Sequence, residues 1–280
     1  MKKQLLTALA FTLSMGMVSV ANAGVVLPSG IAVLEDDNLE YVLDAQGNVK
    51  TTGPLVVGDT LVSYITFSQV LDGSNNVVQN LGAPGQELTG VSAITVVADL
   101  GNSFAFAPSG FLGAGVIANL YEQAAGDFNI ICHVLNTCAA DASNGNLWMS
   151  VGFGDADDFW VAGSAVPNGD LTTVLLEDVA SGAAASKFAV ANFGLSILVN
   201  NTGYMFNQQS CGILSGFCAD DDLVDIIGSG DVLGGSGLTG PYLARSDFDF
   251  QVDRIPEPAT LLLMGLGLLG LGAVRRTKRA

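Results

Sequence analysis

The chain has 280 residues, a formal net charge of −17 and a hydrophobic content of 49%. This hydrophobic content can offset the entropy of folding, so a wholly disordered chain is excluded. Residues 24–254 hold 26 of the 27 acidic residues but only four of the ten basic ones. Such a surface repels phosphate groups, which argues against nucleic acid as a partner and leaves divalent cations, polycations and neutral glycans as compatible ones.

The first 23 residues have the features of a secretory signal peptide. Lys2 and Lys3 precede an apolar run over residues 5–20, and Ala21 and Ala23 are small residues of the kind that signal peptidase accepts before the bond it cuts. The alternative is a membrane-spanning anchor, but the run is short and ends at this small-residue site. The sequence therefore predicts cleavage after Ala23 and export through the inner membrane.

Residues 24–254 are expected to form one mainly β domain. Short apolar or alternating runs favour strands, and clusters of Gly, Asn, Asp and Pro between them are typical of hairpin turns. In the last run, Phe248, Phe250 and Val252 alternate with polar residues, as in a half-buried strand. The runs cover residues 61–67, 91–97, 147–153, 188–199 and 248–252. They predict a single β-sandwich or jelly-roll-like domain.

Two segments have better helix formers and a looser alternation. Residues 114–125 and 171–185 are therefore predicted to contain one or two short helices beside the β core. The run of glycine and serine over residues 228–240 is predicted to be a loop before the final strand.

The four cysteines lie in two close pairs, Cys132 with Cys138 and Cys211 with Cys218. An exported protein with an even number of cysteines favours disulfides, and the spacings favour two local loops. The alternative is a metal site made by Cys132, His133 and Cys138, although oxidation competes for these thiols. His133 is the only histidine, which excludes a metalloprotease motif built on two histidines.

Clusters of acidic residues are the candidates for a calcium site, since Ca²⁺ binds six to eight oxygen ligands and carboxylates two residues apart in a loop can face one cation. None of the clusters fits the EF-hand pattern, and each could equally be a solvated surface. No other cofactor is expected. The clusters are Glu35 to Asp37; Asp155, Asp157 and Asp158; and Asp220, Asp221 and Asp222 with Asp225.

No residue pattern in the sequence identifies a catalytic site. A pair of carboxylates could serve a glycosidase as acid and base or nucleophile, but the sequence nominates no pair. The GxSxG motif of many esterases and lipases is absent. Trp148, Trp160 and Tyr242 could stack on sugars, or they could belong to the core. These observations favour a noncatalytic protein over a secreted carbohydrate-active enzyme or a calcium-dependent glycan-binding module.

Residues 255–280 combine three different features in a fixed order. Pro256, Glu257 and Pro258 come first, and their prolines favour an extended segment. An apolar run over residues 259–274 follows, whose helix of about 24 Å would only marginally span a bilayer core of ~30 Å. The chain then ends in a basic cluster, which the positive-inside rule places in the cytoplasm. The cluster consists of Arg275, Arg276, Lys278 and Arg279.

This tail resembles the PEP-CTERM sorting domain of Gram-negative bacteria that make exopolysaccharide. The resemblance rests on the Pro256-Glu257-Pro258 signature, the Gly- and Leu-rich helix and the arginine-rich end. It implies a transient anchor in the inner membrane and processing by the membrane protease exosortase. It also implies a final place at the cell surface or in the exopolysaccharide matrix, where adhesion, flocculation and biofilm structure are the expected roles. It covers only the tail and leaves the activity of residues 24–254 open.

Overall fold

The computed structural model describes residues 24–82, 86–123, 126, 128, 135–165, 169–212, 216–218 and 222–256. The signal peptide, the basic cluster and the tail from Glu257 onward lie outside these ranges, so the structure does not test the predictions about them. Within the described ranges, no helix is long and apolar enough to cross a membrane.

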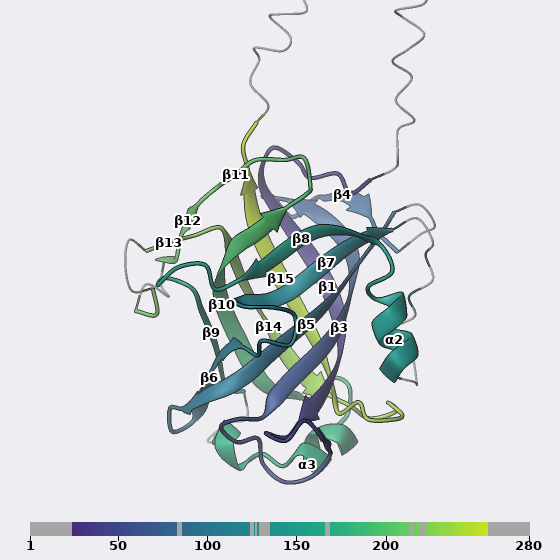
Figure 1. The fold of residues 1–280 in the computed structure, drawn as a ribbon, viewed down its shortest axis with the longest axis vertical. Helices are drawn as coiled ribbons and strands as arrows, with labels where there is room; N and C mark the ends of the chain where they lie inside the picture. Colours follow the sequence, from purple (N-terminus) through teal and green to yellow (C-terminus); the bar gives the residue numbers. More distant parts are fainter. Residues whose placement is uncertain are drawn as a thin grey trace, which may run out of the picture.

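The domain is one antiparallel sheet that closes on itself (Figure 1). Eight strands make the ring, and its last member, β5, pairs back onto its first, β3. In spatial order the ring consists of β3 (Thr60–Asp72), β1 (Gly30–Leu43), β15 (Ala244–Arg254), β14 (Ile226–Gly234), β10 (Lys187–Asn200), β8 (Asn146–Gly152), β7 (Val116–Gln123) and β5 (Glu87–Asp99).

The wall between β5 and β10 is built from two short strand pairs. One half of β5 pairs with β7 and the other half with β6 (Ser103–Pro108), while β10 pairs with β8 and with β9 (Phe159–Ser164) in the same way. Strands β6 and β9 also pair with each other, as do β7 and β8. The barrel is therefore closed along the whole length of β5 and β10.

The remaining elements decorate this barrel. Helix α2 packs on its outer wall, where Cys138 and Ala142 contact a cluster that includes Tyr41, Tyr64 and Tyr242. The short helices η1 and α3 cover one end, and Leu176 of α3 packs there on Val42 and Leu243. These elements and the minor strands are β2 (Val49–Lys50), β4 (Val77–Asn80), α2 (Leu135–Asp141), η1 (Leu171–Thr173), α3 (Leu176–Ser181), β11 (Phe206–Asn207), β12 (Gln209–Ser210) and β13 (Leu223–Val224).

The prediction of a mainly β domain with short helices is confirmed, but the sandwich is wrong. Four of the five predicted strands lie inside observed strands, and the fifth, 147–153, extends one residue beyond β8. The inward and outward alternation of residues is the same in a sandwich and in a barrel. The pairing of β5 with β3 joins segments whose proximity no local pattern reports. Five of the ring strands have 11 to 14 residues, which is long enough for a twisted sheet to curl and close.

Several local predictions are corrected by tertiary pairing. The predicted helix at 114–125 is strand β7, because its backbone bonds to β5 on one side and β8 on the other, and such pairing overrides a weak helix propensity. The predicted helix at 171–185 is only η1 and α3. Helix α2 was not predicted, and the predicted loop at 228–240 is in its first half strand β14.

The glycines of β14 are packing residues. A Cβ atom on Gly228 would lie 2.0 Å from Cζ of Phe193, and one on Gly230 would lie 2.1 Å from Cδ1 of Phe248. Two phenyl rings thus occupy the space that side chains would need. The glycine content that suggested a loop instead lets large aromatic residues pack on a strand.

The disulfide between Cys211 and Cys218 is confirmed. It packs against Phe159 and Val224 in a small cluster beside the barrel. Cys132 and His133 lie outside the described residues, so the pairing of Cys132 with Cys138 and the metal alternative that used His133 stay predictions.

Substituting Gly228→Ala is expected to lower the free energy of unfolding by about 1–3 kcal/mol, because the new methyl group overpacks the barrel against Phe193. Denaturant unfolding of the purified full-length protein measures this. Gly216→Ala is the control, since its Cβ would meet no atom within 4 Å. Equal unfolding midpoints for the two variants would contradict the packing role of Gly228.

Candidate functional site

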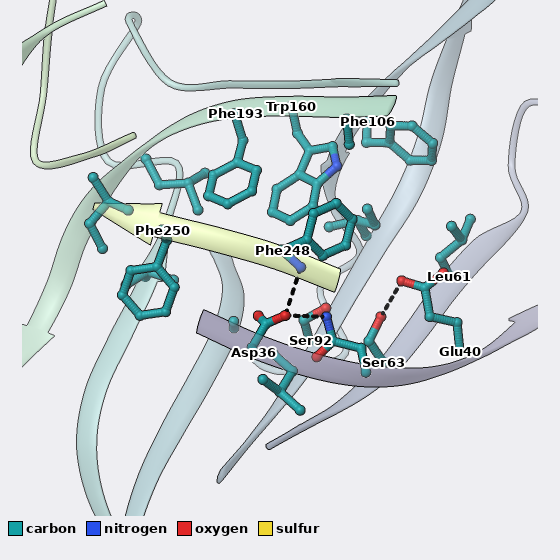
Figure 2. Close-up of a pocket in the computed structure, with 18 of the residues that line it drawn as sticks. Asp36, Glu40, Leu61, Ser63, Ser92, Phe106, Trp160, Phe193, Phe248 and Phe250 are labelled. Carbon is teal, nitrogen blue, oxygen red and sulfur yellow. Dashed lines mark hydrogen bonds between the residues drawn. The ribbon is translucent and has the colours of Figure 1, made fainter. Parts of the chain in front are cut away.

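The barrel is hollow. A cavity of about 60 Å³ lies in its interior, and a second cavity of about 80 Å³ lies beneath η1 and α3. The two cavities adjoin, because they share the lining residues Glu40, Leu61, Phe106, Ala162 and Val232. Most of the lining is apolar, and Figure 2 shows the carboxyl groups of Asp36 and Glu40 on one side with the rings of Trp160 and Phe193 on the other.

Strand β1 supplies the polar side of the cavity. Asp36, Asn38 and Glu40 are two residues apart, so they point to the same face of the strand, and that face is the inside of the barrel. They are only 6, 2 and 5% exposed. We call these three residues the inner stripe.

Asp36 replaces a main-chain acceptor in the sheet. The ladder between β1 and β15 is interrupted at Asp36 and Asp37, and the register between β1 and β3 shifts beside Glu35. In the interruption, the N–H of Phe248 donates to Oδ1 of Asp36 at 2.9 Å. The Nδ2 group of Asn38 donates to the same oxygen at 3.0 Å. The carboxyl group therefore fixes the path of β15 as well as lining the cavity.

Glu40 is held by hydroxyl groups from both neighbouring strands. Its Oε1 accepts hydrogen bonds from Oγ of Ser63 at 3.0 Å and from Oγ of Ser246 at 2.8 Å. Burial raises the pKa of Glu40, and these hydroxyls offset only part of the effect. Burial likewise raises the pKa of Asp36 well above its usual range, against the lowering effect of the Phe248 N–H.

Asn38 leaves one polar atom unused. Its Oδ1 is buried and has no hydrogen-bond partner among the described residues. A buried acceptor without a donor costs about 1–3 kcal/mol. The wall of the cavity thus contains a buried acceptor that no described donor satisfies.

An aromatic wall, made of Trp160, Phe193, Phe248 and Phe250, faces the inner stripe. Trp160 and Phe193 stack with ring centroids 4.2 Å apart, and Phe248 meets both rings edge to face at 5.9 and 6.2 Å. Trp148 is also buried in the core, and Tyr242 is buried under α2. The structure therefore favours the core alternative for all three residues that were candidates for stacking on surface sugars.

A second acidic array, which we call the outer stripe, lies on the outer face of β1, β14 and β15. It consists of Glu35, Asp37, Asp231, Asp247 and Asp249. The register places Glu35 opposite Asp249 and Asp231 opposite Asp247. The pKa values of Asp37, Asp247 and Asp249 are raised. Partial burial is the larger cause, and repulsion by neighbouring carboxylates is the smaller one. Lys187 forms an ion pair with Asp231 at one end of the array.

The described residues of the predicted calcium clusters do not gather around a common point. Strand β1 separates the first cluster, because Asp36 points inward while Glu35 and Asp37 point outward. In the second cluster, Oδ2 of Asp158 accepts bonds from the N–H groups of Gly154 and Asp155, as in a hydrogen-bonded turn. Across the described ranges, no group of three or more His, Cys, Asp or Glu residues could hold a metal ion.

The third cluster is only partly visible. Asp220 and Asp221 lie outside the described residues. Asp222 has a left-handed backbone with φ of 62°, and Asp225 accepts a bond from the N–H of Ile197 at 2.8 Å. The described part of this cluster gives calcium binding no support.

Sequence reasoning did not find the inner stripe, although a signal for it exists. Residues 34–42 alternate, with Leu34 and Val42 flanking the three polar residues at the same parity. Read as a strand, this pattern places a polar patch on an otherwise apolar face. The adjacent acids at 35–37 suggested instead an exposed acidic cluster.

The fold and the site define a closed, hollow β domain with a polar stripe in an aromatic interior. The chain also carries a PEP-CTERM protein-sorting motif, matched at residues 254–276, directly where β15 ends. The motif implies an exported protein that exosortase processes and that is sorted to the cell surface. No curated protein and no solved structure matches the chain.

The domain is expected to be more stable at pH 5 than at pH 7.5. Folding raises the pKa of Asp36, Asp37, Glu40, Asp247 and Asp249, so the folded state holds protons more tightly than the unfolded state. Their contribution to stability is complete when the pH lies below their pKa values in the unfolded state, about 4. It is lost as the pH rises through their raised pKa values in the folded state. The pKa values of Asp44 and Asp72 are lowered in the folded state. Their contribution to stability is therefore lost only as the pH falls below ~4, outside the range compared.

Thermal unfolding of the full-length protein at the two pH values measures this difference. A change of ~1 kcal/mol should move the midpoint of a domain of this size by about 2–4 °C. The variant Glu40→Gln should reduce the difference, while Asp178→Asn, on the exposed face of α3, should preserve it. A midpoint that is higher at pH 7.5 would refute the expectation.

Proposed function

We propose that the barrel is a noncatalytic domain delivered by exosortase to the surface or the exopolysaccharide matrix of a Gram-negative bacterium. There it acts in adhesion, flocculation or biofilm structure. The observation that carries this proposal is the outer stripe, which lies on β1, β14 and β15, the last of which leads directly into the sorting motif.

The outer stripe is costly for the fold, which suggests that it serves another purpose. Like charges directly opposite each other on a sheet destabilise it, yet Glu35 faces Asp249 and Asp231 faces Asp247. Asp247 and Asp249 are exposed. Divalent cations or polycations can bridge such rows of carboxylates between molecules without a preformed site in any one of them. Cross-linking of this kind suits a matrix component.

The geometry of the inner stripe supports a noncatalytic role over a carbohydrate-active enzyme. A glycosidase needs two carboxyl groups about 5–9.5 Å apart on either side of a sugar. Asp36 and Glu40 are four residues apart on one strand, which separates their Cα atoms by about 13 Å. Both side chains are buried and accept bonds from neighbouring residues of the sheet.

Neutralising the outer stripe should weaken cell flocculation in the presence of Ca²⁺ or polylysine. We expect cells that produce the double variant Asp247→Asn with Asp249→Asn to settle more slowly than wild-type cells, because fewer carboxylates remain to be bridged. Settling rates of cell suspensions measure this effect. The control variant, Asp178→Asn with Asp222→Asn, removes the same charge elsewhere, and equal slowing by both pairs would count against a role of the stripe.

Exosortase should change the mass of the mature protein. In cells with exosortase we expect a chain that begins at Gly24 and no longer carries the intact tail, and in cells without it a chain that begins at Gly24 and extends to Ala280. Mass spectrometry of the purified protein distinguishes these forms. An intact C-terminus in both strains would contradict processing.

A further inference from the structure

We propose that the hollow interior of the barrel binds a small amphipathic amine, with its ammonium group at the inner stripe and its apolar body against the aromatic wall. This inference goes beyond delivery to the matrix, since it assigns a ligand class to the cavity itself.

The inner stripe offers acceptors to a ligand that brings donors. Oδ1 of Asn38 is buried and unpartnered among the described residues, and the carboxyl groups of Asp36 and Glu40 line the cavity on either side of it. A primary ammonium group has three N–H donors and no acceptor. It would satisfy Asn38 and reach a neighbouring carboxyl group.

The charge of the cavity favours a cation. Among the described residues, no Lys, Arg or His lines either cavity, so these residues supply no countercharge to the two buried carboxyl groups. A bound ammonium group supplies it, and charge-assisted hydrogen bonds are about twice as strong as neutral ones. An anionic ligand would instead meet two acids, and a purely apolar ligand would leave Asn38 unsatisfied.

The rest of the lining fits an apolar body. The aromatic wall and the aliphatic residues between its rings offer contact area, and aromatic faces attract a nearby cation. The adjoining cavities of about 60 and 80 Å³ together resemble in size an engineered cavity of ~150 Å³ that binds benzene. A ligand with a single ring and a short amine side chain therefore matches the available space.

The end beneath α3 is the route by which such a ligand would enter. The second cavity lies there, and α3 has only six residues. Two hydrogen bonds join the cover to Gly53: the N–H of Leu176 donates to O of Gly53 at 2.9 Å, and the N–H of Gly53 donates to Oε2 of Glu177 at 2.7 Å. Two more join it to the residues that follow β14: the N–H of Gly235 donates to O of Val179 and the N–H of Ser236 donates to O of Gly182, both at 2.9 Å. Local opening of a short surface helix needs much less free energy than global unfolding.

Calorimetric titration of the full-length protein in detergent tests the proposal, with benzylamine, benzyl alcohol and benzoate as probes. Benzylamine is expected to bind at least ~10-fold more tightly than benzyl alcohol, and benzoate is expected not to bind. Asp36→Asn should weaken the binding of benzylamine by about 10- to 100-fold, because it removes the charge-assisted bond beside Asn38. Asp37→Asn is the matched control, since it removes the neighbouring charge on the outer face of the same strand.

Nuclear Overhauser contacts between the benzylamine ring and the indole of Trp160 provide a readout that needs no variant of the stripe. We expect these contacts in the wild-type protein, even if Asp36→Asn does not fold. The proposal is overturned if benzylamine does not bind or binds no more tightly than benzyl alcohol. It is equally overturned if Asp37→Asn weakens binding as much as Asp36→Asn, or if the ring contacts only surface residues.

Discussion

Strand β5 pairs with β3 over seven residue positions, from Thr60 opposite Thr95 to Thr66 opposite Thr89. This pairing gives the ring of strands no free edge and divides the side chains into an enclosed set and an outward set. Alternate residues of β1 and β15 thereby acquire opposite environments. Asp36 is enclosed and Asp37 meets solvent, although they are neighbours in the chain. The two acidic stripes exist because of this division.

The enclosed set combines features that oppose one another energetically. The aromatic wall and the glycines of β14 fit closely, as Gly228 and Phe193 illustrate, and this packing stabilises the barrel. The inner stripe does the opposite, because desolvating a carboxyl group is costly even when serines surround it. Asp36 recovers part of that cost by accepting the N–H of Phe248 where the ladder is interrupted. A cavity remains because rings and a polar strip cannot fill a cylinder completely.

The sequence predicts the parts of this fold whose causes are local. Strand 248–252 is predictable because Phe248, Phe250 and Val252 alternate with polar residues, and alternation depends only on neighbouring residues. The closure of the barrel could not be predicted, since β3 and β5 carry the same pattern in any all-β architecture. The segment of β7 contains good helix formers and becomes a strand only because partners lie on both sides. The inner stripe could not be predicted for a related reason. Three consecutive acids at 35–37 suggest an exposed surface until their strand is known to line the inside of a barrel.

Gly30 at the start of β1 lies opposite Arg254 at the end of β15. The described chain thus begins and leaves at one pole of the barrel, and α3 caps the other pole (Figure 1). A C-terminal tail that held the protein at a membrane would place the pole with the chain ends toward the lipid and the capped pole outward. The domain would then be presented in one orientation, with the cover over its cavity as the part most accessible to molecules arriving from the surroundings.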